Sequence, residues 1–157
     1  MNTSASARLP GAGPLLGLDW GRRRIGVACS DPDQSIAFPL STLTRRTGRR
    51  FPLQQLREAI ADLAPTGIVV GLPLESDGSE GDTARQVRRE GARVEEATGL
   101  PLVYWDERMT TARVRRTARE LGIDPAVDPA RIDTLSAVVL LQHYLDSQCR
   151  PSPDASA

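Results

Sequence analysis

The sequence contains no lysine, one histidine and two cysteines among its 157 residues, and this scarcity excludes several kinds of site. Cys29 and Cys149 have neither the spacing of metal ligands nor that of a CxxC pair, so we expect no zinc site and no disulfide framework. No apolar run is long enough to span a membrane. The first ten residues lack the basic and apolar segments of a secretory signal. We therefore expect a cytoplasmic protein without a membrane partner.

Excess charge of either sign is also lacking, because twenty basic residues, all of them arginine, balance twenty acidic ones. A net charge of zero argues against binding of nucleic acid through bulk charge, so any such surface must be local. One arginine cluster, Arg85, Arg89 and Arg93, forms a stripe on the exposed side of a predicted helix. We predict that this stripe contacts phosphates; a solvated helix face is the alternative.

The length suits one domain with a core of its own. We expect residues 1–13 and 150–157 to be disordered tails and residues 14–149 to form the domain. Short apolar segments at 15–19, 24–30 and 36–44 are separated by tight turn signals, which predicts a three-stranded antiparallel meander.

Strands and helices alternate in the rest of the chain. Residues 67–71 form a continuous apolar run, typical of a strand buried on both faces, and residues 102–105 predict another strand. Periodic apolar positions predict helices over 51–63, 81–98, 110–121 and 133–148. The sequence thus predicts an α/β fold in which a mixed sheet is flanked by helices.

Acidic residues occur where strands end. Asp19 ends the first predicted strand, Glu107 follows the last one, and Asp133 begins the final predicted helix. Ligands of open α/β sheets bind outside the carboxyl ends of the strands, where these carboxylates could converge. Oxygen ligands suit Mg²⁺ or Mn²⁺, and such ions can promote hydrolysis of a phosphodiester bond. Alternatively, Asp19 could stabilise a turn, Glu107 could belong to an exposed ion-pair patch, and Asp133 could cap the final helix.

Four motifs carry a resemblance to a known family. They are LGLDWGRRRIGVACSD (16–31), IVVGLPLESDGSEG (68–81), DERMTT (106–111) and IDTLSAVVLLQHYL (132–145). In order and spacing the chain resembles the YqgF family of ribonuclease H-like proteins, described as Holliday junction resolvases and pre-16S rRNA nucleases. The resemblance implies a ribonuclease H-like fold with a five-stranded sheet, the meander plus two parallel strands.

The resemblance also implies a site and a function. It places the catalytic and metal-binding acids on Asp19, Glu107 and Asp133, with Asp106 as a weaker fourth candidate. Arg24 and Arg108 match motif arginines that either meet phosphate or pair with the carboxylates. The implied function is a nuclease dependent on Mg²⁺ or Mn²⁺. Its expected partner is structured nucleic acid: RNA first, as in processing of the 5′ end of pre-16S rRNA during ribosome biogenesis, and branched DNA second, as in a Holliday junction resolvase.

Other assignments remain open at this point. Ribosomal precursor particles are a further expected partner, and the chain could act as a monomer or a homodimer. A non-catalytic nucleic-acid-binding module on the same scaffold is an alternative of another class. Sugar kinases and actin-like ATPases use a similar unit but need two such domains, which 157 residues cannot supply.

Overall fold

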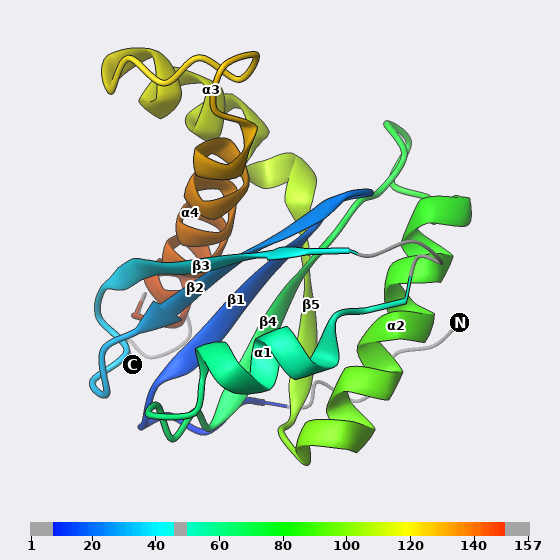
Figure 1. Cartoon of the computed structure of the whole chain (residues 1–157), viewed down its shortest axis with the longest axis vertical. Coiled ribbons are helices and arrows are strands. Elements are labelled where there is room, and N and C mark those ends of the chain that lie inside the picture. Colours follow the sequence, from blue (N-terminus) through cyan, green and yellow to red (C-terminus); the bar gives the residue numbers. More distant parts are fainter. Residues whose placement is uncertain (1–7, 46–49, 150–157) are drawn as a thin grey trace, which may run out of the picture.

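The computed structural model describes residues 8–45 and 50–149, which form a five-stranded sheet flanked by helices (Figure 1). The strands lie in the order β3-β2-β1-β4-β5. An antiparallel meander is formed by β1 (Leu15–Trp20), β2 (Arg24–Ser30) and β3 (Ala37–Thr44), whereas β4 (Gly67–Leu72) and β5 (Leu102–Asp106) run parallel to β1. This confirms the predicted mixed sheet.

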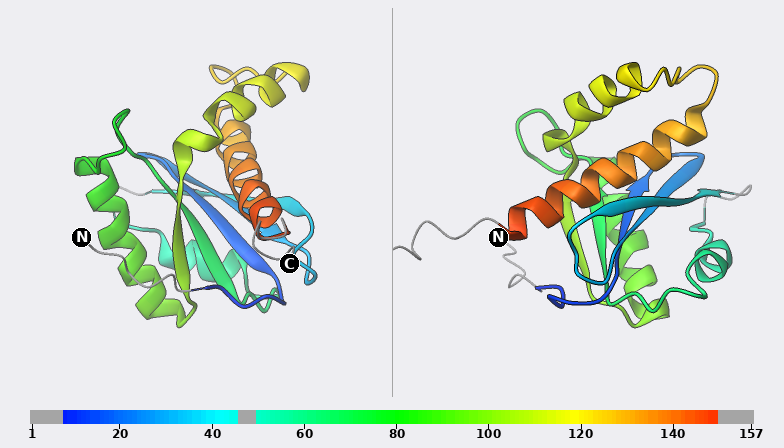
Figure 2. Two further views of the ribbon diagram at one scale, coloured as in Figure 1. Left: turned by 180° about the vertical axis from the view of Figure 1, so that it is seen from behind. Right: turned by 90° about the vertical axis from the view of Figure 1, so that its left-hand side faces the viewer.

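The helices cover the two faces of the sheet unequally. On one face lie α1 (Leu53–Ala59) and α2 (Asp82–Thr98), and on the other lies α4 (Pro129–Cys149) (Figure 2). A short 3₁₀ turn (Glu107–Met109) leads from β5 into α3 (Thr111–Glu120), which packs on α4. None of the helices in the described part of the chain is long and apolar enough to cross a membrane.

Two helices differ by more than one residue from their predicted bounds. The first helix is shorter than residues 51–63, because Pro52 occupies its N-cap position and the backbone leaves the helix at Ile60. The last helix begins at Pro129 rather than at Asp133. Proline suits the first turn of a helix, where its missing N–H is not needed, and the Asp128 side chain accepts a hydrogen bond from the backbone N–H of Arg131.

Alternation along the strands divides the core into two layers. In β1, Leu16 and Leu18 pack towards α1 and α2, whereas Leu15 packs towards α4. Because alternate side chains point to opposite faces of a strand, Asp19 shares the α4 face with Leu15. All six residues of β4 are buried, as its continuous apolar run predicts.

Glycines allow α4 to lie very close to the meander. A Cβ atom added at Gly26 would lie 1.9 Å from the backbone oxygen of Asp133, and one added at Gly17 would lie 2.8 Å from Cβ of Leu141. A side chain at position 26 would therefore overlap the helix backbone itself. This contact fixes Asp133 directly above the strand that neighbours Asp19.

A buried ion pair ties the end of β1 to α2. Arg45 donates two hydrogen bonds to Glu90, of 2.9 and 2.8 Å, and Trp20 donates its indole N–H to the same carboxylate. Arg45 also donates to the carbonyl of Gly21. Burial raises the pKa of Glu90, but the hydrogen bonds from Arg45 and Trp20 and the charge of Arg45 outweigh it, so the net pKa is lowered.

We expect Glu90→Gln to lower the free energy of unfolding by about 2–3 kcal/mol, since Gln cannot balance the buried charge of Arg45. The lowered pKa gives the sign of the pH dependence. The ionised pair stabilises the fold above the ordinary pKa of 4.5, and this contribution is lost as pH falls below it. Denaturant melts from pH about 3 to 7 test this. The loss should be largest near neutral pH and shrink in acid, whereas Glu96→Gln, on the exposed side of α2, should change little. A pH-independent loss would contradict the charge argument.

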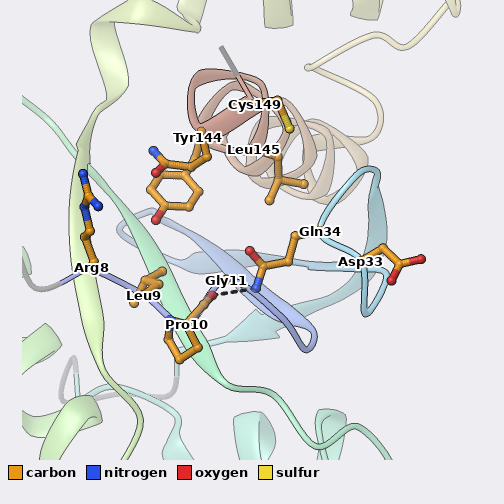
Figure 3. Close-up of a pocket in the computed structure, with 10 residues that line it drawn as sticks. Arg8, Leu9, Pro10, Gly11, Asp33, Gln34, Tyr144, Leu145 and Cys149 are labelled. Carbon is orange, nitrogen blue, oxygen red and sulfur yellow. Dashed lines mark hydrogen bonds between the residues drawn. The ribbon is translucent and has the colours of Figure 1, made fainter. Parts of the chain in front are cut away.

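The predicted N-terminal tail is not uniformly free of structure. Residues 1–7 lie outside the described part, as do residues 150–157 of the predicted C-terminal tail. Residues 8–13 are held against the turn between β2 and β3, where Gln34 donates its amide to the carbonyls of Pro10 and Gly13, and Leu9 is buried (Figure 3). The structure thus gives residues within 8–13 defined contacts with the folded domain. Residues 8–11 border a cleft of about 470 Å³ beside the C-terminal end of α4.

Candidate active site

Asp19 and Asp133 reach the same place from opposite ends of the chain. Asp19 pairs in register with Gly26 of β2, and the backbone of Asp133 lies directly against Gly26. The two carboxylates are close enough for the charge of Asp133 to raise the pKa of Asp19. The contact of α4 with the sheet thus brings together acids that are more than a hundred residues apart.

Glu107 completes the cluster from the end of β5. In the parallel pairing, β4 lies between β1 and β5, and Gly71 of β4 leaves room for the Glu107 side chain. A Cβ atom at Gly71 would lie 3.6 Å from Oε2 of Glu107. That oxygen is buried and has no hydrogen-bond partner in the described part of the chain. A buried carboxylate oxygen without a hydrogen-bond partner destabilises the fold unless a bound ligand contacts it.

The electrostatics of the cluster favour an additional positive charge. Burial, followed by the charges of Glu107 and Asp133, raises the pKa of Asp19 from 3.8 to about 8. Burial, followed by the charge of Asp106, also raises the pKa of Glu107. Asp19 and Glu107 are thus both held where the ionised carboxylate is disfavoured. A divalent cation would relieve both effects.

The carboxylates of Asp19, Glu107 and Asp133 are suitable ligands for a hard divalent metal ion, although in this structure they do not surround a common point. Within residues 8–45 and 50–149, no group of three or more His, Cys, Asp or Glu side chains forms a ready-made metal site. The donor atoms are all carboxylate oxygens, which suit Mg²⁺ or Mn²⁺. One of them, Oε2 of Glu107, lacks any partner in that part of the chain.

Arg24 and Arg108 both pair with carboxylates. Arg24 donates from Nε to Oδ2 of Asp133 over 2.7 Å and so holds one of the acids. Arg108 pairs with Asp106 at 2.8 Å, and this partner lowers the pKa of Asp106. Both Asp106 oxygens accept hydrogen bonds from Arg108, so Asp106 is paired with an arginine, whereas Oε2 of Glu107 is left without a partner in the described part of the chain.

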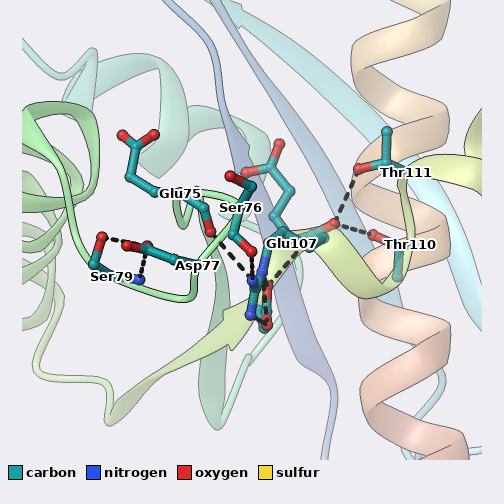
Figure 4. A network of polar contacts seen from close by, with 9 residues as sticks. Glu75, Ser76, Asp77, Ser79, Glu107, Thr110 and Thr111 are labelled. Carbon is teal, nitrogen blue, oxygen red and sulfur yellow. Dashed lines mark hydrogen bonds and ion pairs between the residues drawn. The ribbon is translucent and has the colours of Figure 1, made fainter.

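Arg108 also fastens the loop between β4 and α2, whose residues Glu75 and Ser76 lie beside Glu107 in Figure 4. Its Nη1 donates to the carbonyls of Glu75 and Ser76, each over 3.2 Å. The same loop is closed by a hydrogen bond from the backbone N–H of Gly78 to the Glu75 carbonyl. The guanidinium of Arg108 thus links Asp106, the residue before Glu107, to the loop between β4 and α2.

The stripe of Arg85, Arg89 and Arg93 is not brought together with the acids. All three residues are exposed on α2, which covers the sheet face opposite α4. Arg85 pairs with Asp82 on the same helix. A nucleic acid held at the acids would have to pass around the edge of the sheet to meet the whole stripe.

Sequence reasoning missed two features near the site. Glu90 lies three residues after the buried Val87 of α2 and so falls on the buried side of this helix. An acidic residue at such a position indicates a buried ion pair. Its partner Arg45 could not be identified without the fold. The helix start at Pro129 was also missed, and it excludes the helix-cap alternative for Asp133, which lies within the helix.

The sheet order and the acids at the carboxyl ends of β1 and β5 define the class of the protein. It has the ribonuclease H-like fold, and the convergent carboxylates are the chemistry expected of a nuclease on that scaffold.

Comparison with known proteins identifies the family. Residues 13–147 match the family model described as RuvX: Holliday junction resolvase. A "Putative pre-16S rRNA nuclease" of Roseiflexus sp. (strain RS-1) is 40% identical over 136 residues, covering 87% of this chain and 96% of the relative. A relative of the same name from Chloroflexus aurantiacus is 38% identical over 142 residues, covering 90% and 92%. The chain belongs to the RuvX (YqgF) family and is a nuclease, so nucleic acid is its substrate.

A solved structure supports the fold. T. thermophilus RuvC in complex with a Holliday junction substrate aligns with a TM-score of 0.50 over 86% of this chain and 95% of RuvC, at 13% identity. Identity at that level shows the fold alone. The ribonuclease H-like fold implied by the sequence motifs is therefore confirmed.

Proposed function

We propose that the protein is a metal-dependent nuclease that hydrolyses phosphodiester bonds in structured RNA and processes the 5′ end of pre-16S rRNA in the cytoplasm. The observation that carries the proposal is that Asp19, Glu107 and Asp133 lie near one another at one end of the sheet, where burial and then the charges of Glu107 and Asp133 raise the pKa of Asp19. The name shared by the relatives favours pre-16S rRNA as the substrate.

In this proposal Asp19, Glu107 and Asp133 are the metal ligands and catalytic residues. A bound Mg²⁺ or Mn²⁺ supplies Lewis-acid stabilisation of the phosphoryl group and lowers the pKa of the attacking water. The rigid contact of α4 with β2 keeps Asp133 in reach of Asp19, and Arg24 orients Asp133 through the 2.7 Å ion pair. The short turn after β5 directs Glu107 over Gly71.

A Holliday junction resolvase is the second candidate, because the family description carries that activity. Such an enzyme makes paired cuts in a junction and should act as a two-fold symmetric dimer. Cleavage of single RNA sites, within a ribosomal precursor particle or in free RNA, does not require a dimer.

Activity is expected to require Mg²⁺ or Mn²⁺ and to disappear in EDTA, because the proposed ligands are carboxylates. The measurement is cleavage of single-stranded RNA, a pre-16S rRNA fragment and four-way junction DNA side by side with each metal. Preferential cutting of the rRNA fragment would support the proposal, and preferential cutting of the junction would support the resolvase. Full activity in EDTA would exclude the metal mechanism, and metal-independent binding without cleavage of any substrate would favour a non-catalytic binding module.

A further inference from the structure

The helix α3 carries an unusual concentration of positive charge next to the proposed active site. Of its ten residues, four are exposed arginines, Arg113, Arg115, Arg116 and Arg119, and one, Glu120, is acidic. The side chains of these four arginines form no hydrogen bond or ion pair with any residue that the structure describes. The charge of this helix is therefore available to a partner outside the chain.

The helix is fixed relative to two of the acids. At its start, the hydroxyls of Thr110 and Thr111 donate to the carbonyl of Glu107 over 3.1 and 3.2 Å (Figure 4). Beyond its end, the backbone N–H of Ile123 donates to the carbonyl of Ala118 over 2.9 Å, which turns the chain back towards α4. The helix packs on α4, which carries Asp133. Substrate held by α3 would thus be held next to both carboxylates.

The arginines occupy the side of α3 that points away from the protein. Ala118 is buried, whereas Arg115, Arg116 and Arg119 are all exposed. Residues three and four positions apart are neighbours on a helix surface, so Arg119 adjoins both Arg116 and Arg115. The guanidinium groups on such a strip can each donate two hydrogen bonds to a phosphate group.

We propose that α3 is the arm that binds the phosphate backbone of the nucleic-acid substrate while the neighbouring acids cut it, an inference that rests on the proposed nuclease function. Zero net charge requires any such surface to be local, and α3 is a local basic surface adjoining the site. The ligand is the phosphodiester backbone shared by RNA and DNA. The contacts are with phosphates, so they position the substrate without reading its sequence.

The stripe on α2 is the competing surface. It carries the same number of arginines as the strip of Arg115, Arg116 and Arg119, which permits a comparison at equal charge. Arg85 is already paired with Asp82, and the helix lies on the other face of the sheet from Asp133. Removing three charges from α2 should therefore weaken binding less than removing three from α3.

The test compares three triple variants: Arg115/Arg116/Arg119→Gln, the same positions changed to Lys, and Arg85/Arg89/Arg93→Gln. Binding to a labelled RNA hairpin and a labelled DNA duplex is measured in EDTA over a series of salt concentrations. The α3 glutamine variant should lose about 2–3 units from the slope of log K against log salt, and bind about a hundredfold more weakly near physiological salt. The lysine variant should keep the slope, because the positive charges remain.

The outcomes separate this inference from the function on which it rests. Equal losses from the α2 and α3 glutamine variants, or an unchanged slope in the α3 variant, would overturn the inference even if the unmodified protein cleaves RNA with Mn²⁺. A loss confined to the α3 variant in a protein that cleaves nothing would support the binding arm and reject the nuclease. Unchanged melting temperatures in all variants show that the folded proteins are compared, and a lysine variant that binds as poorly as the glutamine variant would reject the charge mechanism.

Discussion

Asp19→Asn is expected to reduce cleavage by at least about a hundredfold and, without metal, to raise the melting temperature. Loss of groups that merely support a metal ligand costs about 10–100-fold, so loss of a ligand should cost no less. Asparagine keeps the shape of aspartate but cannot ionise, whereas ionisation of Asp19 in the fold is disfavoured by burial and by its two acidic neighbours. A gain of about 1 kcal/mol would raise the melting temperature of a domain of this size by about 3 °C.

The pH dependence of that gain has a definite sign. The folded-state pKa of Asp19 is raised from 3.8 to about 8, so the folded protein holds this proton more tightly than the unfolded chain does. The associated stability is complete below the unfolded pKa and is lost as pH rises towards 8. In EDTA, the unmodified protein should lose stability between about pH 5 and 8, whereas Asp19→Asn should lose less.

Melting temperatures with and without Mn²⁺, together with cleavage rates, check these expectations. Mn²⁺ should stabilise the unmodified protein more than Asp19→Asn or Glu107→Gln, because a ligand stabilises the fold only as far as it binds. Asp62→Asn, at an exposed position outside the site, is the matched control and should behave like the unmodified protein. Near-normal cleavage by Asp19→Asn, or equal protection of all variants by Mn²⁺, would remove Asp19 from the metal site.

Local patterns were sufficient to predict the sheet. The strands depend on short-range signals, such as the wholly apolar β4 and the turns that separate β1, β2 and β3. The position of the acids at strand ends is equally local, so the sequence alone is enough to propose Asp19 and Glu107 as site residues. Their proximity follows from the parallel order of β1, β4 and β5.

Long-range contacts could not be predicted in the same way. Nothing in the segment around Glu90 indicates that its partner is Arg45, because the pair forms only when α2 is laid across the end of the meander. The hydrogen bonds from Arg108 to the carbonyls of Glu75 and Ser76 could not be predicted either, because they too join segments that are far apart in the sequence. Arg24 and Arg108 could each contact phosphate or pair with a carboxylate. Only the side-chain geometry of the structure shows which carboxylate each arginine meets.

Gly26→Ala is expected to lower the free energy of unfolding by about 3 kcal/mol and to impair cleavage at the same time. The new Cβ would lie 1.9 Å from the backbone oxygen of Asp133, an atom that cannot move unless α4 moves with it. Overpacking of this kind costs about 1–3 kcal/mol, and contact with backbone rather than with a flexible side chain places this site at the upper end. The melting temperature should fall by about 6–12 °C.

The loss of cleavage should exceed what instability alone explains. Lifting α4 from β2 moves Asp133 away from Asp19, and a displacement of about 1 Å at a catalytic group can cost about a hundredfold in rate. Cleavage is therefore measured well below the melting temperature, where the variant is folded. Gly11→Ala is the matched control, since a Cβ atom there meets nothing within 4 Å. If Gly26→Ala melts and cleaves like Gly11→Ala, the close contact of α4 with β2 does not position Asp133, and another part of the fold must hold it beside Asp19.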